Sequence, residues 1–110
     1  MNQPRQIRHY IGNEFTDSVS GKTFDNVAPA TKESLGLVAE GHTAEIDAAV
    51  TAAQQALKGP WAKTSAAERA QKLREIGKLV SAHHEELARL EALDTGKPIS
   101  EARPGDIQRV

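Results

Sequence analysis

The side chains that could do chemistry in this 110-residue chain are four histidines and fifteen carboxylates, and the sequence contains no cysteine. The lack of cysteine excludes a thiol nucleophile, a disulfide and a zinc-thiolate site. His83 and His84 are adjacent, and neighbours on a helix point about 100° apart, so this pair is poorly placed to share one metal ion. The carboxylates are predicted to lie on solvated helix faces and in turns. We therefore assign no catalytic residue from the residue types alone.

A phosphate-binding glycine loop is also missing from the sequence. Dinucleotide-binding folds place G-x-G-x-x-G between a strand and a helix, because glycine lets the backbone approach the pyrophosphate. The glycines of the first part of the chain never form this pattern, and they are Gly12, Gly21, Gly36 and Gly41. No cofactor-binding residue is predicted within this chain.

Composition and charge limit the class of protein. Fourteen basic and fifteen acidic residues give a formal net charge of -1, and the two signs alternate along the chain. This pattern lacks the basic surface that nucleic-acid and membrane-surface binding require. No long apolar run follows the polar N-terminus, so neither a signal peptide nor a transmembrane helix is predicted, and the expected location is the cytoplasm.

The part of the chain before Gly41 is predicted to form short strands separated by turns. Gly12-Asn13 is a two-residue loop typical of a tight β-hairpin, and Pro29 is expected to stop a later strand. The predicted strands are His9–Ile11, Glu14–Thr16, Thr23–Val27 and Ser34–Ala39.

The part of the chain after Gly41 is rich in alanine and has helical periodicity. Thr43 is predicted to cap a first helix that Gly59-Pro60 ends. Ser65 and Glu68 match a capping box, in which each side chain satisfies the other residue's backbone N–H, and they predict the start of a second helix. The predicted apolar stripes are Ile46, Val50, Ala53 and Leu57 in the first helix, and Leu73, Ile76 and Val80 in the second.

A third helix is predicted after a break near Ser81. Its stripe consists of Leu87, Leu90 and Leu93, and Gly96 with Pro98 supplies the usual stop signal. The last stretch, residues 100–110, is predicted to be helical with an interruption at Pro104-Gly105, since proline has no N–H to donate.

The end of the third predicted helix leads into Asp94-Thr95-Gly96-Lys97-Pro98, and residues 90–98 resemble a segment of the aldehyde dehydrogenase family with a similar D-T-G-K-P loop. The resemblance covers nearly the whole chain from about His9. Ala28 is a departure, because the family usually has asparagine directly before the Pro-Ala step, and Pro104-Gly105 is another. The weaker matches follow the family order, and they are Tyr10–Phe15, Ser20–Phe24, Pro29–Thr31, Ile46–Val50, Trp61 and Glu68-Arg69.

The resemblance implies an α/β fold with short antiparallel N-terminal strands followed by three or four helices. These elements would form the N-terminal portion of the family's Rossmann-like domain. Residues 1–110 are accordingly expected to be an incomplete N-terminal part of the dinucleotide-binding domain, with strands and turns in residues 1–41 and helices in residues 42–110.

The resemblance also implies an oxidoreductase that converts an aldehyde to a carboxylic acid with NAD or NADP. In the family a cysteine thiolate attacks the aldehyde, hydride leaves to the nicotinamide and an acidic residue activates water, and these groups come from sequence beyond this chain. The chain alone is therefore expected to be inactive. Gly59-Pro60-Trp61 and Asp106-Ile107 are similar to the hydroxymuconic-semialdehyde and betaine-aldehyde dehydrogenase groups. The expected partners are the aldehyde substrate and further copies of the enzyme in a homo-oligomer, without nucleic acid or membrane.

One site of the family maps onto this segment. Some members bind a monovalent cation near the first strands and the D-T-G loop, and the corresponding residues here are Asn26, Val27 and Asp94. Two backbone carbonyls and a carboxylate would supply the oxygen ligands that hard cations favour. The alternative interpretation is that Asp94 is a turn residue that hydrogen-bonds the backbone at a helix end.

Two hypotheses of other classes remain open. A small helical module could bind a partner through the stripes of the first two predicted helices. A truncated remnant without activity would leave the same stripes exposed. The first predicts a stable folded chain, and the second predicts a poorly soluble one.

Overall fold

The computed structural model describes residues 5–108, which fall into two compact units. The first unit contains the described residues up to Val27 together with Ser34–Lys63. The second unit contains Ala28–Glu33 together with the described residues from Thr64 onward. The loop between the paired strands β4 and β5, Ala28–Glu33, therefore belongs to the helical unit.

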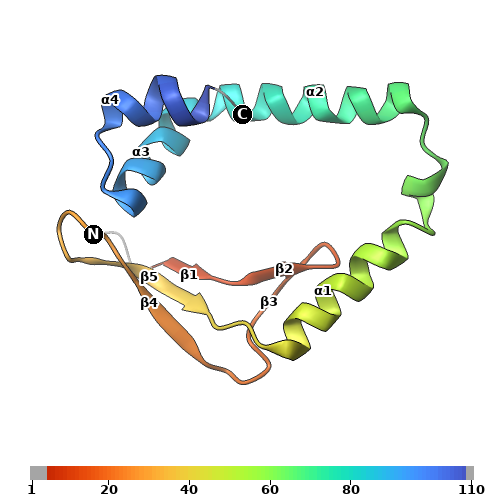
Figure 1. The fold of residues 1–110 in the computed structure, drawn as a ribbon, viewed down its shortest axis with the longest axis horizontal. Helices are drawn as coiled ribbons and strands as arrows, with labels where there is room; N and C mark the ends of the chain where they lie inside the picture. The colour runs from red at the N-terminus through yellow and green to blue at the C-terminus, as the bar shows by residue number, and fades with distance from the viewer. Residues whose placement is uncertain (1–4, 109–110) are drawn as a thin grey trace. The chain divides into compact units, whose positions relative to one another are not determined.

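The first unit is built on a sheet with the strand order β1-β5-β4. Strands β4 (Thr23–Val27) and β5 (Ser34–Ala39) pair antiparallel, and both match the predicted bounds. Strand β1 (Arg5–Ile7) was not predicted, and it pairs with β5 in parallel. Figure 1 shows β1 and β4 on the two sides of β5. Gly36 allows this approach, because its φ is 146° and a Cβ atom there would collide with the Arg5 carbonyl.

A separate hairpin is formed by β2 (His9–Ile11) and β3 (Glu14–Thr16), as predicted. Gly12 and Asn13 both have positive φ, 60° and 68°, which is the conformation that a two-residue hairpin loop of this twist requires. The rings of Tyr10 and Phe15 lie 4.9 Å apart across the strands. Local sequence chemistry therefore accounts for this element.

Helix α1 (Thr43–Ala56) completes the first unit with the 3-10 turn η1 (Pro60–Lys63). The predicted cap was wrong by one residue, because the N-cap is His42 and Thr43 is already helical. Histidine is not a preferred cap, but the Glu45 carboxylate accepts the His42 backbone N–H at 2.8 Å. The helix is thus capped from its own first turn.

The second unit consists of α2 (Ala66–Ala82), α3 (His84–Thr95), the short α4 (Ile99–Glu101) and the π-helix η2 (Ala102–Ile107). The predicted capping box at the start of α2 is confirmed. The break between α2 and α3 lies at His83, two residues after the predicted position at Ser81.

The end of the described chain is helical, as predicted, but Pro104-Gly105 does not break it. The backbone changes from α to π geometry at Ala102 and continues through the proline to Ile107. A π-turn spaces its hydrogen bonds more widely than an α-turn, and proline in an α-helix would clash with the preceding turn. Residues 109 and 110 of the predicted segment lie outside the described residues.

The buried apolar side chains among the described residues are all small. They are Ala28, Ala39, Ala88 and Ala102, and no large side chain is fully buried. The predicted stripes of α1 and α2 are exposed instead, with Ile46 at 62% and Leu73 at 69%. These elements therefore have well-formed backbones but bury little apolar surface within this chain.

Candidate functional site

The three residues of the predicted cation site belong to different units. Asn26 and Val27 end strand β4 in the first unit, and the pairing with β5 is irregular between them. Asp94 lies in the last turn of α3 in the second unit. Residues 5–108 contain no group of three or more His, Asp or Glu side chains that could hold a metal ion. A site made of two backbone carbonyls and one carboxylate would not form such a group, so the cation site stays a prediction.

The D-T-G-K-P loop is held in shape by hydrogen bonds from its own residues. Thr95 Oγ1 donates to the carbonyl of Glu91 at 2.7 Å, and the Lys97 N–H donates to Thr95 Oγ1 at 3.3 Å. Gly96 is left-handed with φ of 75° and ends α3, as the sequence predicted. A Cβ atom at Gly96 would lie 3.0 Å from Cγ of Pro29, so glycine also makes room for the β4–β5 loop.

Lys97 joins this loop to the π-helix. Its Nζ lies 2.6 Å from Oδ2 of Asp106, and this hydrogen bond is the main reason that the pKa of Lys97 is raised above its ordinary value. Arg103 in η2 contributes a second link, with its Nε 2.8 Å from Oε1 of Glu85. His84 Nε2 lies 2.7 Å from the Arg103 carbonyl. The His83-His84 pair thus has one member occupied in fixing η2 to the start of α3.

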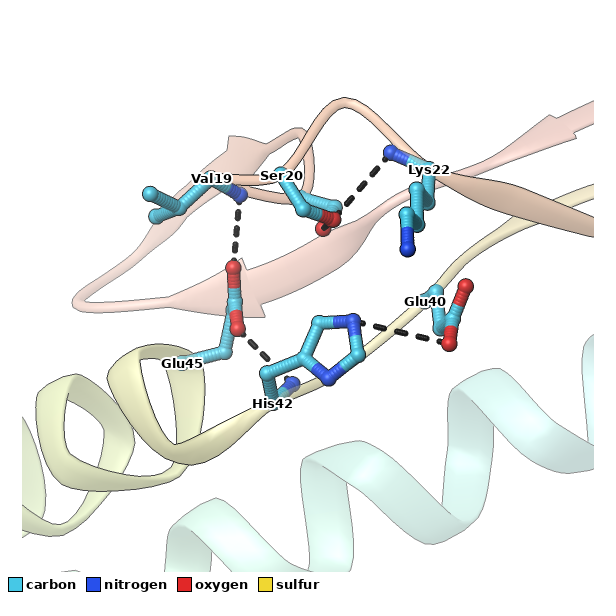
Figure 2. A network of polar contacts seen from close by, with 7 residues as sticks. Val19, Ser20, Lys22, Glu40, His42 and Glu45 are labelled. Carbon is cyan, nitrogen blue, oxygen red and sulfur yellow. Dashed lines mark hydrogen bonds and ion pairs between the residues drawn. The ribbon is translucent and has the colours of Figure 1, made fainter.

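The first unit has its own polar network, centred on Glu45. Its carboxylate accepts the N–H of Val19 at 2.6 Å and the N–H of His42 at 2.8 Å (Figure 2). These backbone donors, Val19 first, lower the pKa of Glu45 against the opposing effect of burial. Glu45 therefore ties the start of α1 to the turn after the hairpin.

The turn that Glu45 contacts is closed by its own short-range hydrogen bonds. The Gly21 N–H donates to the Ser18 carbonyl at 2.9 Å, and the Lys22 N–H donates to Ser20 Oγ at 3.2 Å. In Figure 2, His42 extends beside the same network, with Nε2 3.5 Å from Oε1 of Glu40. The network is structural in character, since its acceptors are used by neighbouring backbone groups.

Sequence reasoning missed both of these networks. No local pattern indicates the contact of Glu45 with Val19, because 26 residues separate them along the chain. The Lys97–Asp106 pair had no signal, because nine residues separate its members across two changes of backbone geometry. The position of Glu45 third in a helix was the one usable indication.

The junction between strand β5 and helix α1 is occupied by carboxylates. In dinucleotide-binding folds, a strand-to-helix junction of this kind cradles the pyrophosphate with free backbone N–H groups. Here the carboxylate of Glu45 already occupies the start of the helix, and Glu40 lies beside it. Two carboxylates at this position oppose the binding of a further anion.

Comparison with known proteins identifies the chain. The model of the aldehyde dehydrogenase family matches residues 15–110. A 2-hydroxymuconic semialdehyde dehydrogenase from Pseudomonas sp. strain CF600 is 46% identical over 96% of this chain. The chain belongs to the aldehyde dehydrogenase family.

Solved structures agree with this assignment. An aldehyde dehydrogenase from Bacillus cereus in complex with NAD+ is 45% identical, with a TM-score of 0.91 over 94% of this chain. A betaine aldehyde dehydrogenase from Staphylococcus aureus, also in complex with NAD+, is 36% identical, with a TM-score of 0.87 over 92% of this chain. The predicted α/β fold, as the N-terminal portion of an aldehyde dehydrogenase, is confirmed.

The chain corresponds to a small part of these relatives. It spans 22% of the length of the Pseudomonas enzyme and 21% of the Bacillus cereus structure.

Among the described residues no helix is both long and apolar enough to cross a membrane.

Proposed function

We propose that this chain acts as the N-terminal segment of an NAD(P)-dependent aldehyde dehydrogenase that oxidises an aldehyde to a carboxylic acid. The match of residues 15–110 to the family, together with a backbone that follows the Bacillus cereus enzyme at a TM-score of 0.91, carries the proposal. The NAD+ complexes of two relatives support the choice of cofactor.

The segment's role is structural support of the active enzyme. The chain has no cysteine to act as the nucleophile, and its β5–α1 junction does not suit a dinucleotide. Its contribution is therefore a set of strands and helices that flank the nucleotide-binding core as an incomplete part of that domain, over residues 1–110. The 110-residue chain by itself is expected to have no activity.

The favoured substrate is a hydroxymuconic semialdehyde, with betaine aldehyde as the second choice. The first choice is supported by two 2-hydroxymuconic semialdehyde dehydrogenases that are 46% and 49% identical to this chain. The second is supported by the Staphylococcus aureus betaine aldehyde dehydrogenase, which is 36% identical. We also propose that the complete enzyme is cytoplasmic and forms a homo-oligomer. The absence of a membrane-spanning helix among residues 5–108 and the alternating charges of the chain are compatible with it.

A monovalent cation bound by the carbonyls of Asn26 and Val27 and the carboxylate of Asp94 is a further part of the proposal. Oxygen ligands of this kind suit a hard cation. The thermal stability of the active enzyme is then expected to depend on potassium or sodium concentration, and Asp94→Asn is expected to reduce that dependence. If the stability of the variant depends on the cation as strongly as that of the unchanged enzyme, Asp94 is not a ligand of the cation.

Two measurements on the gene product from its own cells test the enzymatic function. The first is its intact mass, and the second is aldehyde-dependent formation of NADH with each of the two aldehydes, with omission of NAD as the control. The proposal expects a mass several times the 11.9 kDa of this chain, together with activity. A product of 11.9 kDa without activity would overturn it and leave the interaction module or the remnant.

A further inference from the structure

Two ion pairs join the π-helix η2 to parts of the chain at opposite ends of helix α3. Arg103 donates to Glu85 in the first turn of α3, with Nε 2.8 Å from Oε1 and Nη2 3.0 Å from Oε2. Asp106 accepts from Nζ of Lys97, two residues after the end of α3, at 2.6 Å. Two side chains only three residues apart in η2 therefore reach partners that are separated by the length of α3.

An α-helix would place Arg103 and Asp106 on the same side of η2. Residues three apart in an α-helix differ by only about 60° around the axis, because each residue turns by about 100°. A π-helix closes its hydrogen bonds from i to i+5, so each residue turns by less and residues three apart diverge further. The π geometry of Ala102–Ile107 therefore suits two side chains with partners in different directions.

Pro104 lies between these two residues and opposes the α geometry. In an α-helix its ring would clash with the carbonyl of Ser100, four residues earlier, and it has no N–H to donate to that carbonyl. The backbone changes to π geometry at Ala102, two residues before the proline. Helices α2 and α3 contain no proline, and both keep α geometry throughout.

Contacts within this chain hold η2 against α3. The two helices pack together, and Ala88 of α3 and Ala102 of η2 are each 0% exposed. Nε2 of His84, the first residue of α3, donates to the Arg103 carbonyl at 2.7 Å. The geometry of η2 is therefore tied to buried and hydrogen-bonded partners among the described residues.

The π geometry also decides where Ile107 and Gln108 point. Both line a hollow of about 330 Å³ together with His84 and residues of the C-terminal half of α2. A return to α geometry would remove one residue from the wide turn and rotate the residues beyond it by about 100°. Ile107 and Gln108 would then point away from the hollow.

We propose that Pro104 selects the π geometry of η2, and that this geometry allows Arg103 and Asp106 to close their ion pairs at the same time. The segment η2 is thus a conformational device, because one proline sets the direction of the side chains on both sides of it. The proposal concerns the conformation of the chain and is independent of aldehyde oxidation.

The test is nuclear magnetic resonance of the 110-residue chain, in which backbone hydrogen bonds are detected as couplings between donor and acceptor. In π geometry the N–H of Ile107 pairs with the carbonyl of Ala102, and in α geometry it pairs with the carbonyl of Arg103. Pro104→Ala is expected to move this coupling from Ala102 to Arg103. Alanine is the best helix former, so the variant keeps a folded helix in which the coupling can be measured.

The same variant is expected to open at least one of the two ion pairs. Exchange of the Nζ protons of Lys97 or of the Nε proton of Arg103 should become about threefold faster or more, as for loss of an exposed ion pair. Retention of the coupling to Ala102 in Pro104→Ala would overturn the proposal. A change to α geometry that leaves both exchange rates unaltered would also overturn it.

Two control variants separate Pro104 from its surroundings. Pro98→Ala makes the same chemical change outside η2, at the N-cap of α4, and should keep the coupling to Ala102. Asp106→Asn should accelerate proton exchange at Lys97 but keep the π geometry. If either control changes η2 to α geometry, Pro104 is not the residue that selects it. Because no turnover is measured, failure of this proposal leaves the proposed enzymatic function untouched.

Discussion

The backbone N–H of Val19 donates a hydrogen bond to Oε1 of Glu45, 2.6 Å away and 26 residues further along the chain. The other carboxylate oxygen accepts from the N-cap of α1, so one side chain both starts a helix and fixes a distant turn. Glu45 is 5% exposed, which shields both hydrogen bonds from water.

Glu45→Ala is expected to release the turn after the hairpin. Removal of the acceptor leaves the Val19 N–H unpaired, and its amide hydrogen should exchange about tenfold faster or more. Glu68→Ala is the matched control, because Glu68 also sits third in a helix and exchanges hydrogen bonds with Ser65, three residues earlier. Equal exchange at Val19 in the two variants would show that Glu45 does not hold the turn.

Acid is expected to destabilise the chain through three glutamates. Backbone and side-chain donors lower the pKa of Glu45, Glu68 and Glu75 below the ordinary value of 4.5. A lowered pKa in the folded state means that the stabilisation is complete above the unfolded-state pKa and is lost as the pH falls through the folded-state pKa. The free energy of unfolding, measured by urea denaturation, should therefore decrease as the pH falls below 4.5. An increase in the free energy of unfolding on acidification would contradict this expectation.

Gly96→Ala is expected to destabilise the helical unit by about 1 kcal/mol or more. The residue has φ of 75°, and the new Cβ would press against Pro29 at 3.0 Å. Gly77→Ala makes the same chemical change in an open helical position, and it should stabilise the isolated chain by about 0.5–1 kcal/mol. Opposite signs in thermal or urea unfolding are the expected outcome. A neutral Gly96→Ala would mean that the loop after α3 tolerates a side chain.

Ser65→Ala is expected to weaken the start of α2 at a cost of about 1 kcal/mol. Ser65 Oγ accepts the Glu68 N–H at 3.2 Å, and alanine cannot replace that acceptor. Ser65→Asp retains an acceptor and serves as the control. Amide exchange in the first turn of α2 should increase in the alanine variant alone. Increased exchange in both variants would show that the start of α2 needs the serine hydroxyl group and that another acceptor at residue 65 does not replace it.

The elements that depend on neighbours in the sequence were predictable. The Gly12-Asn13 hairpin, the Ser65 capping box and the Gly96 stop each use backbone conformations and hydrogen bonds that close within four residues. The order of the weaker motifs along the chain was likewise enough to indicate the aldehyde dehydrogenase family. Such features are set by local sterics, local donors and residue order, so a linear reading finds them.

The candidate cation site could be predicted only as residue names taken from a resemblance. Asn26 and Val27 lie in one unit and Asp94 in the other, so no periodicity or spacing in the sequence relates them. The position of the first cap, at His42, was missed for a similar reason. It depends on where the carboxylate of Glu45 points and not on the identity of the capping residue.

The sequence by itself determined the family, the hairpin, the three main helices and their stop signals. Only the tertiary structure decided the parallel pairing of β1 with β5, the contact of Glu45 with Val19, the Lys97–Asp106 pair and the π-geometry around Pro104. These features join residues or backbone groups whose meeting depends on the packing of several elements. Their free energy is gained only when the chain is folded, and residue order alone does not encode it in a readable pattern.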